Sequence, residues 1–582
     1  MKFENKVVLI TGSGTGIGMT VAKKFVENGA SVIILGRRKE PLESTSEMLT
    51  KIINEKNTNG FVRIFSGVDV SDENAITEMF DAIKDEGINV DVIVNNAGVS
   101  GPVTCFAHAS LEDFRSTVDI HLTGTFWTSV QALKVMKEGA KIITISTFFA
   151  EERPLEQRPY RFRGPYTASQ GAKNRLVEAM SWELTEKGII SIGTNPGPVH
   201  SDRIYKTVYP KAASEFLRVS GFEELIPTEV EAANKEILGL LGESDDTIKN
   251  GIKVAAEKLC KQESTLTNLL NKVQSIAEKI QKNTSTMIAD QQFLSQDQVA
   301  TTVLTLADDD QAKILNGKII PGDRVFYPVR AHITSIPKTV KQHDYSSKIA
   351  VLTIDATDDE DAKRAEEIAA NVESNGGKAI CFISDKCTKE IQDSITNKFH
   401  SHVIDFSKNE EISRWFNTAK TKGDIEVCIH ITGKVPSISK LTELSRNKWD
   451  ELTNKFINIP AAVSQNAMNV FVPNGSDDPR LFKDAKGRIV IVGPDLPHGK
   501  KISGGERAKV EVFRGALRPF ATTINQELSD VLKSNVRTFL VLAGTVDGRE
   551  PKNSRITDAI NYSISNDSES SAEVIFCPDE LR

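Results

Sequence analysis

The sequence has few cysteines, no long apolar run and no excess of basic residues, and each shortage excludes a class of protein. Six cysteines in 582 residues, none of them in a C-x-x-C pair, argue against a disulfide framework or a zinc ribbon and fit a reducing compartment. No apolar run reaches the length that crosses a bilayer, and the formal net charge of −7 argues against a nucleic-acid binder. We therefore expect a cytoplasmic protein with no metal, membrane or nucleic-acid partner.

Residues 7–18, V-V-L-I-T-G-S-G-T-G-I-G, are the most informative stretch of the chain. An apolar run predicts a buried strand, glycines follow at once, and a helical period comes next. This order is a dinucleotide-binding fingerprint, because glycine lets the backbone approach a pyrophosphate and a helix N-terminus offers free N–H groups. Cofactor contacts are predicted in this turn at Gly12, Ser13, Thr15, Gly16, Ile17 and Gly18.

The ends of the next two predicted strands are placed to meet the adenosine half of such a cofactor. The apolar run 30–35 leads into Arg37 and Arg38, and the following one ends at Asp69 and Val70. An acidic residue after the first of these strands would bind the ribose of NAD, whereas arginine accommodates the 2′-phosphate of NADP. Arg37 and Arg38 therefore favour NADP(H), with a solvated loop pair as the alternative, and Asp69 and Val70 are predicted to meet the adenine.

A fourth apolar run, 90–94, leads into the motif N-N-A-G. Together with the glycine-rich turn, this motif resembles the short-chain dehydrogenase/reductase family. The resemblance implies an α/β fold with a doubly wound parallel sheet, a nicotinamide cofactor and a tyrosine-based proton relay. It also implies cofactor contacts at Asn95, Ala97 and Gly98 and, after a later strand, at Pro196, Gly197 and Val199.

The proton relay of the family is only partly present in this sequence. Tyr166 opens the run Y-T-A-S-Q-G-A-K, so Gln170 stands where the family has a lysine that lowers the phenol pKa. A neutral amide cannot lower a pKa through charge, although it can hydrogen-bond a ribose. Thr147 stands at the usual serine position with Ser146 before it, and either hydroxyl could polarise a carbonyl. His121 replaces the relay asparagine and could carry protons, since its ordinary pKa is ~6.5.

Lys173 lies a further turn along the same face of the predicted helix and is a partial substitute for the missing lysine, at doubtful reach. The other interpretation of these replacements is a weak or inactive site.

Residues 145–203 resemble the bacterial malonyl-CoA reductases, which are built from tandem short-chain reductase units. The resemblance is carried by S-T-F-F-A-E-E at 146–152, R-P-Y-R-F-R-G-P-Y at 158–166 and N-P-G-P-V-H-S-D-R at 195–203, with a further match at 516–528. In that family one unit reduces malonyl-CoA to malonate semialdehyde and the other reduces the semialdehyde to 3-hydroxypropionate. The loop 158–166 looks more like the thioester-reducing unit.

Arginines gather in these passages, and their chemistry suits an acidic substrate. Substrate contacts are predicted at Tyr160, Arg163 and Arg203, because planar guanidinium groups clamp carboxylates and phosphates. The alternative is a solvated basic loop.

The length of the chain predicts more than one domain, because single cores stop growing beyond roughly 250–300 residues. We expect an NADP-binding domain at 1–334 with a helical insertion at about 204–295, a linker at 335–346, and a second unit at 347–582. The insertion is either a lid over a large substrate such as an acyl-CoA or a packed helical hairpin. The second unit repeats the strand pattern, but D-A-T-D-D-E-D follows its first strand without a glycine.

The expected fold is therefore two tandem Rossmann-like, doubly wound parallel sheets, the second a degenerate, cofactor-free copy. The second unit would act structurally, as an intramolecular dimer partner, with a divergent ligand-binding role as the alternative. A homodimer of the whole chain is a further alternative.

We expect an NADPH-dependent reductase of a carboxylated acyl-CoA or semialdehyde, with malonyl-CoA as the leading substrate. The alternatives are reduction of malonate semialdehyde to 3-hydroxypropionate, and a non-catalytic NADPH-binding subunit that pairs with an active homologue. Gln170 and His121 favour the binding subunit, whereas the intact glycine motifs and the arginines favour the enzyme.

Overall fold

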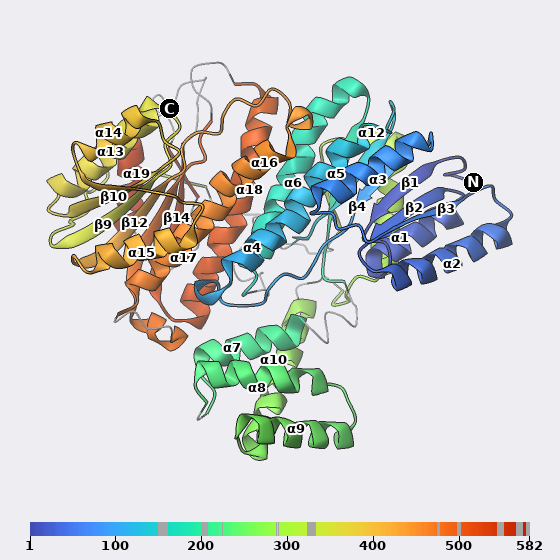
Figure 1. Cartoon of the computed structure of the whole chain (residues 1–582), viewed down its shortest axis with the longest axis horizontal. Coiled ribbons are helices and arrows are strands. Elements are labelled where there is room, and N and C mark those ends of the chain that lie inside the picture. Colours follow the sequence, from blue (N-terminus) through green and yellow to red (C-terminus); the bar gives the residue numbers. More distant parts are fainter. Residues whose placement is uncertain are drawn as a thin grey trace.

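The computed structural model describes residues 1–148, 161–199, 208–223, 225–286, 288, 290–322, 333–473, 478–496, 502–543, 552–565 and 574–577. They form two parallel β-sheets at the two sides of Figure 1, with a layer of helices between the sheets and a helical segment below them.

The first sheet has seven strands in the order β3-β2-β1-β4-β5-β6-β7, and all neighbours are parallel. The apolar runs of the sequence form its strands because helices cover both faces of the sheet. The strand bounds are β1 Val7–Thr11, β2 Ser31–Gly36, β3 Val62–Ser66, β4 Val92–Asn95, β5 Lys141–Ile145, β6 Ile190–Pro196 and β7 Ile319–Gly322. The strand order reverses between β1 and β4, and ligands bind at such a switch point, outside the carboxyl ends of the strands.

Two layers of helices enclose this sheet. One face packs on α1, α2, α11 and α12 through side chains such as Phe25, Leu49 and Val303. The other face packs on α3, α4, α5 and α6 through Phe80, Phe114 and related side chains. The helix bounds are α1 Gly16–Glu27, α2 Lys39–Lys56, α3 Glu73–Asp85, α4 Leu111–Val118, α5 Gly124–Ala132, α6 Gly164–Leu184, α11 Gln296–Leu306 and α12 Asp309–Ile314.

The second sheet repeats the strand order of the first and adds one strand, in the order β11-β10-β9-β12-β13-β14-β15-β8. Its strands are β8 Ile333–Ser335, β9 Lys348–Ile354, β10 Lys378–Ser384, β11 His400–Ile404, β12 Asp424–Ile431, β13 Lys486–Val492, β14 Asn535–Ala543 and β15 Val574–Cys577. Its helices are α13 Asp359–Ser374, α14 Lys389–Thr396, α15 Asn409–Lys420, α16 Arg446–Thr453, α17 Ile459–Phe471, α18 Gly504–Gln526 and α19 Asn553–Ser565. The predicted tandem fold is therefore observed.

The edge strand β8 differs from the sequence-based division of the chain. Ile333 and Thr334 pair in parallel with Val574 and Ile575 of β15, so the second sheet begins within the residues assigned to the first unit, 1–334. The remainder of that division, with a linker at 335–346 and a second unit at 347–582, stays a prediction.

In its described residues the predicted insertion has four α-helices, which lie together below the sheets in Figure 1. They are α7 Tyr209–Ser220, α8 Pro227–Ile237, α9 Asp245–Leu259 and α10 Glu263–Thr286. Leu266, Leu269, Leu270 and Val273 of α10 pack on the other helices in a separate hydrophobic cluster. The helical period of the sequence therefore produced a small core of its own.

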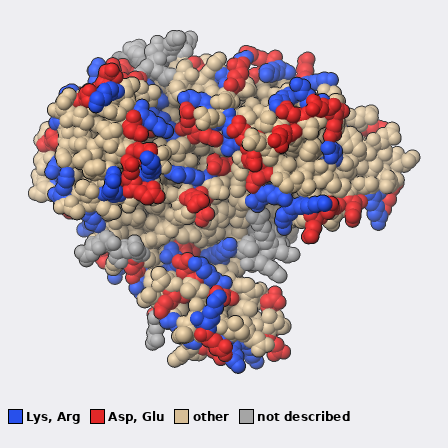
Figure 2. Space-filling model, viewed as in Figure 1, with Lys and Arg blue, Asp and Glu red and all other residues tan. Residues whose placement is uncertain are grey.

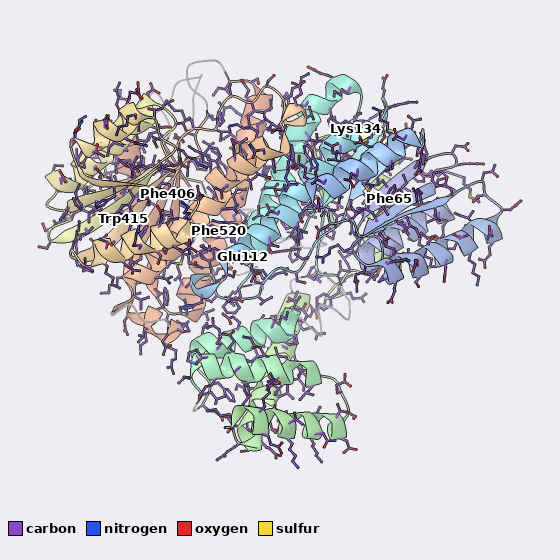
Figure 3. All side chains as sticks on the ribbon, viewed as in Figure 1. Phe65, Glu112, Lys134, Phe406, Trp415 and Phe520 are labelled. Atoms are coloured by element: carbon purple, nitrogen blue, oxygen red, sulfur yellow. The ribbon has the colours of Figure 1, made fainter. Side chains whose placement is uncertain are left out.

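The helices α6 and α18 pack against each other between the sheets, and they join the two halves in one hydrophobic core. A Cβ added at Gly171 of α6 would lie 2.1 Å from the carbonyl oxygen of Gly515 of α18, so the two backbones touch. Beside them Phe520, labelled in Figure 3, packs edge-on to Phe106 and Phe114 with ring centroids 4.9 and 5.6 Å away.

Charges of both signs are interspersed over the face shown in Figure 2, without a continuous basic stripe there. Among the described residues no helix combines the length and the low polarity that crossing a membrane requires.

The backbone contact between α6 and α18 gives a direct test. Gly171→Ala places a methyl group against the Gly515 carbonyl, and overpacking of this kind costs about 1–3 kcal/mol. We expect the free energy of unfolding in urea, followed by far-UV circular dichroism, to fall by this amount. Gly239→Ala is the control, because its Cβ would meet no atom within 4 Å. Identical unfolding curves for both variants would contradict the close packing.

Candidate active site

A cavity of about 850 Å³ opens at the carboxyl ends of β1, β2, β4 and β5 and extends to α6. It joins the glycine-rich turn to the predicted catalytic residues. Its walls include these predicted site residues: Gly12, Thr15, Gly16, Ile17, Arg37, Arg38, Asp69, Val70, Ala97, Gly98, His121, Ser146, Arg163, Tyr166, Gln170 and Val199.

The glycine-rich turn has the geometry that a phosphate requires. Gly12 and Gly16 have φ angles of +66° and +62°, which residues other than glycine rarely adopt. A Cβ at Gly18 would lie 2.5 Å from the Gly12 carbonyl oxygen. The helix α1 begins at Gly16 with no acid in its first turn and no side-chain cap from Thr15. Its first N–H groups are therefore available to an anion.

Asn96 fixes this turn against β4, although the sequence analysis did not select it. Its side-chain amide donates to the carbonyl oxygens of Thr11 (3.0 Å) and Gly12 (3.2 Å). The Thr11 hydroxyl oxygen accepts from the backbone N–H groups of Asn96 and Ala97, both at 2.9 Å. The second asparagine of N-N-A-G was the available signal. Successive residues of a strand face opposite sides, so Asn95 and Asn96 should point to different surroundings.

Asn95 and Ser13 lie beneath the cavity rather than in its wall. The Asn95 amide donates to the Ser129 hydroxyl at 2.9 Å, and the Ser13 hydroxyl donates to the Ile10 carbonyl at 2.9 Å and accepts from the Leu35 N–H at 3.0 Å. Both side chains therefore tie neighbouring elements together. Gly18, Pro196, Gly197 and Thr147 are likewise absent from the described wall.

Two arginines stand at the open end of the cavity. Arg37 pairs with Asp69 at 3.5 Å between Nη1 and Oδ2, and its side chain is 62% exposed. Asp69 also accepts from the hydroxyl and the N–H of Ser71, at 2.7 and 3.0 Å. Arg38 precedes the first turn of α2. A phosphate at this end would meet two exposed cations and one carboxylate that already has partners.

Tyr166 lies in the first turn of α6 with charged and aromatic groups around its ring. The guanidinium carbon of Arg163 is 3.8 Å from the ring centroid, and the His121 ring stands edge-on at 5.3 Å. Arg163 Nη2 donates to the Ser100 carbonyl at 2.7 Å. Within the described part of the chain, the buried Ser146 hydroxyl has no hydrogen-bond partner. Of the two candidate hydroxyls, Ser146 lines the cavity and Thr147 does not.

Gln170 is hydrogen-bonded to His121. These are the two residues that depart most from the family pattern. Gln170 Nε2 lies 3.0 Å from His121 Nδ1, and His121 Nε2 lies 2.9 Å from the Val99 carbonyl oxygen. This chain is consistent with an amide that donates to Nδ1 and an Nε2–H that donates to Val99. Gln170 Oε1 is then a buried acceptor without a described partner. Gly98 makes room for the histidine, because a Cβ there would lie 2.5 Å from Cε1.

Lys173 also lines this cavity, and its side chain is buried in α6. Burial lowers the pKa of its ammonium to about 7. The sequence analysis judged its reach doubtful from helix spacing alone. Gln296, at the start of α11, and Asn96 are further wall residues that it did not select.

Two predicted substrate residues, Tyr160 and Arg203, lie outside the described residues, so their roles stay predictions.

The second half fills the corresponding place with its own side chains. Asp358 caps α13 by accepting from the N–H groups of Glu360 and Asp361 at 3.1 and 3.0 Å. Lys434, from the segment I-T-G-K, places Nζ 2.8 Å from Asp358 Oδ2 and 3.0 Å from Glu360 Oε2. The N–H donors that stay open at the start of α1 in the first half therefore have counterparts here that are satisfied internally.

The second half also reaches the entry of α6 through Glu527. Its two carboxyl oxygens accept from the backbone N–H groups of Phe106 and Phe162, each at 2.8 Å. Burial raises the pKa of Glu527 to about 8, against the opposite effect of these two donors. Phe162 has a φ angle of +68° and directly precedes Arg163. The segment that carries Arg163 and Tyr166 is therefore held by a residue of the other half.

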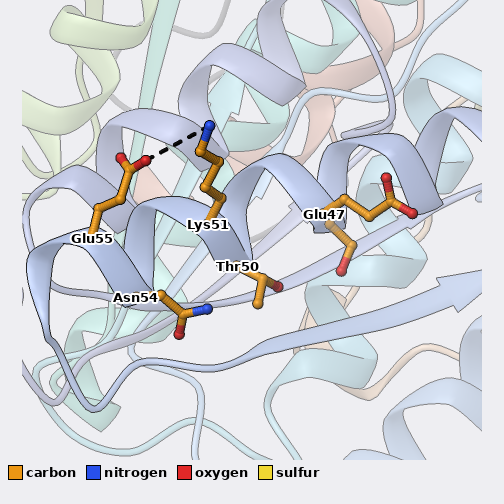
Figure 4. A pocket seen from close by; sticks show the side chains of 6 residues that line it. Glu47, Thr50, Lys51, Asn54 and Glu55 are labelled. Atoms are coloured by element: carbon orange, nitrogen blue, oxygen red, sulfur yellow. Dashed lines mark ion pairs between the residues drawn. The ribbon is translucent and has the colours of Figure 1, made fainter.

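Two further hollows lie among the described residues, away from the predicted catalytic side chains. One of about 850 Å³ lies between α6, β7 and α18, and one of about 560 Å³ runs along α2 (Figure 4), lined by side chains of that helix alone. The described part of the chain has no cluster of His, Cys, Asp and Glu able to hold a metal ion.

Comparison with known proteins agrees with this architecture. Residues 6–209 match the family described as short chain dehydrogenase. A 3alpha-hydroxysteroid dehydrogenase of Mediterraneibacter gnavus is 32% identical over 206 residues, which are 35% of this chain and 78% of that protein.

Two solved structures resemble the whole chain. The C-domain with NADP of a bacterial malonyl-CoA reductase has a TM-score of 0.76 at 16% identity and covers 99% of both chains. The N-domain with NADP has a TM-score of 0.70 at 15% identity and covers 100% of this chain and 98% of that one. The predicted resemblance to one tandem unit is thereby confirmed for the fold. With the matched family and the 32% identical relative, the chain belongs to the short-chain dehydrogenase family.

Proposed function

We propose that this protein reduces a carboxylated acyl-CoA thioester or semialdehyde with NADPH, and that malonyl-CoA is reduced to malonate semialdehyde. The observation that carries this is one cavity that joins the phosphate-binding turn to Tyr166, with the Arg163 guanidinium against the tyrosine ring. A cation beside the proton donor suits a substrate that bears an acid group.

The cavity fits NADP(H) on several observations. The turn at Gly12 and Gly16 and the uncapped start of α1 suit a pyrophosphate, and Arg37 and Arg38 suit a 2′-phosphate. The unpartnered Gln170 Oε1 would accept from a ribose hydroxyl. The two malonyl-CoA reductase domains of the same fold were crystallised with NADP, which supports this choice of cofactor.

When bound, NADPH would supply the hydride for the carbonyl carbon. Tyr166 donates its phenolic proton to the carbonyl oxygen, which gains negative charge. With a thioester substrate the resulting hemithioacetal then releases CoA as the free thiol, its hydroxyl proton passing to the sulfur, and leaves the semialdehyde. The Ser146 hydroxyl donates a hydrogen bond to the same oxygen, in keeping with its lack of any other described partner. His121 and Gln170 hold the α6 side of the site through their mutual hydrogen bond. Arg163 holds the carboxylate of the substrate, and Tyr160 and Arg203 complete that end.

The second half has a supporting role in this proposal. It acts as an intramolecular dimer partner through α18 and binds no cofactor of its own. A homodimer of the whole chain is part of the same proposal.

Two other functions remain as candidates. Reduction of malonate semialdehyde to 3-hydroxypropionate would use the same residues on a smaller substrate. A non-catalytic NADPH-binding subunit is favoured by one observation, since Gln170 is neutral and its amide is engaged by His121.

Turnover tests the proposal directly. Purified protein should oxidise NADPH, followed at 340 nm, with malonyl-CoA, and malonate semialdehyde is run in parallel. Tyr166→Phe removes the proton donor, so turnover should fall about 10²- to 10⁴-fold while NADPH still binds. Tyr562→Phe in α19 is the matched control. Oxidation with the semialdehyde alone would assign the second step, and tight binding without oxidation would favour the binding subunit.

The choice of NADPH over NADH depends on the two arginines. Changing Arg37 and Arg38 together to alanine should weaken NADPH binding about 10- to 100-fold, because hydrogen bonds to charged groups contribute about 1.5–3 kcal/mol. The affinity for NADH should change little. Lys39→Ala is the control, since this neighbouring cation is 72% exposed and pairs with Glu43. Equal losses for both cofactors would identify the arginines as a solvated pair.

The acid end of the substrate is tested at Arg163. Arg163→Met should raise the KM for malonyl-CoA about 10-fold or more, because it removes a charge-assisted contact of about 1.5–3 kcal/mol. Acetyl-CoA, which lacks the carboxylate, should be affected far less in the same assay. Similar changes with both thioesters would show that Arg163 does not hold the carboxylate.

A further inference from the structure

The buried Lys173 lines the inner cavity, and the proposed reaction gives it no role. Lys173 follows Gln170 by three residues and Tyr166 by seven, so the three side chains share one face of α6. Long helical side chains point back toward the N-terminus, which directs the Lys173 stem toward Gln170. Lys173 lines the same cavity as both residues.

The environment of Lys173 is unusual for a structural lysine. The residue is 1% exposed. In the described residues no charged group contributes to its lowered pKa, which burial alone explains. Burying an ammonium without a partner is costly, and lysines are almost never fully buried unless paired. A buried amine that faces a cavity instead finds its partner in what the cavity binds.

Neighbouring charges do not explain the lowered pKa of Lys173. The titratable groups that share the cavity are His121, Tyr166, Asp69, Arg37, Arg38 and Arg163, and burial is the single cause of the lowered pKa of Lys173, about 7. On the other elements packed against α6, β6 has no titratable side chain, and Glu511 of α18 pairs with Arg514 and Arg518. Asp119 lies with His121 on the turn Asp119–Thr123, and α4 adds Glu112, Asp113 and Arg115.

We infer that Lys173 supplies the positive charge of the site that Gln170 cannot supply, and that it takes up a proton when the anionic dinucleotide binds. The amine is largely neutral above neutral pH in the empty cavity, and the phosphate charges of NADPH favour its charged form. One proton passes from the buffer to Nζ as the complex forms. The ammonium then faces the Tyr166 end of the cavity and favours the developing phenolate.

The sign of the pH dependence follows from this linkage. Because the pKa of Lys173 is higher in the complex than in the free protein, NADPH binds more tightly at low pH. Between the two pKa values, the Kd for NADPH should rise about tenfold for each pH unit. In Lys173→Met, which keeps an unbranched apolar side chain, this slope should be absent.

Proton uptake is the decisive measurement, and NADPH itself is the probe. Isothermal titration calorimetry of the full chain at pH 8, in two buffers of different ionisation enthalpy, should show an uptake of up to about 0.9 proton that Lys173→Met loses, as expected for a group with a pKa of about 7. Lys51→Met, on the exposed face of α2 (Figure 4), is the matched control and should retain the uptake. Equal uptake in wild type and Lys173→Met would overturn the inference.

A relocated lysine separates a role in charge from a role in packing. Lys173→Met should lower kcat at least about tenfold and abolish the limb near pH 7 in the profile of kcat/KM. The double variant Lys173→Met with Gln170→Lys should recover turnover, because it returns a cation one turn closer to Tyr166. Unchanged kcat and an unchanged pH profile in Lys173→Met would also overturn the inference.

The inference rests on the proposed function, and the outcomes distinguish the two. Failure of the wild-type protein to bind NADPH would overturn both. Binding and oxidation of NADPH without any Lys173-dependent proton uptake would overturn the role of Lys173 alone.

Discussion

The contact between the backbones of α6 and α18 is the constraint on which the rest of the structure depends. Gly171 and Gly515 lack side chains where the helices meet, and a Cβ at either position would lie within 3 Å of an atom of the opposite helix. Tyr166, Gln170 and Lys173 project from α6 into the cavity on another face. The close packing of α6 on α18 therefore sets the positions of these three side chains. The second half thus positions α6 without contributing a wall to the cavity in the described residues.

The same dependence reaches the loop before α6. Glu527 accepts from Phe106 and Phe162, and Glu215 of the helical insertion accepts from the N–H of Cys105 at 2.7 Å. Three parts of the chain that are far apart in sequence therefore meet where the segment of Arg163 begins. Buried carboxyls bonded to backbone N–H groups specify position more strictly than apolar packing does, because a displaced partner leaves an unsatisfied polar group in a dry interface. The insertion consequently takes part in placing this segment, whichever substrate it faces.

Local signals made much of the fold predictable from the sequence. Apolar runs, glycines and helical periods act over a few residues, so the strands other than β8 and β15, the turn at Gly12–Gly18 and α6 were expected near their observed places. The pairing of β8 with β15 was not, because it joins Ile333 to Val574 and no pattern in a three-residue strand shows such a partner. In the site, the helix spacing between Tyr166 and Lys173 gives only their separation along the helix axis. It does not show the length and direction of the Lys173 side chain, which bring it to the cavity. The choice between Ser146 and Thr147 likewise needed the backbone beyond β5, since neighbouring residues there face opposite sides.

The division of labour between the halves follows from where each places its charges. A phosphate needs N–H donors that nothing else occupies, and the first half keeps them open by having no acid in the first turn of α1 and no cap at Thr15. In the second half Asp358 occupies the equivalent donors and Lys434 neutralises the acids that follow. Lys434 is therefore already paired with carboxylates. In the first half, no described charged group contributes to the pKa of Lys173. The two copies of one fold thus differ in their electrostatics: the second satisfies these groups within itself, whereas the first leaves its N–H donors open.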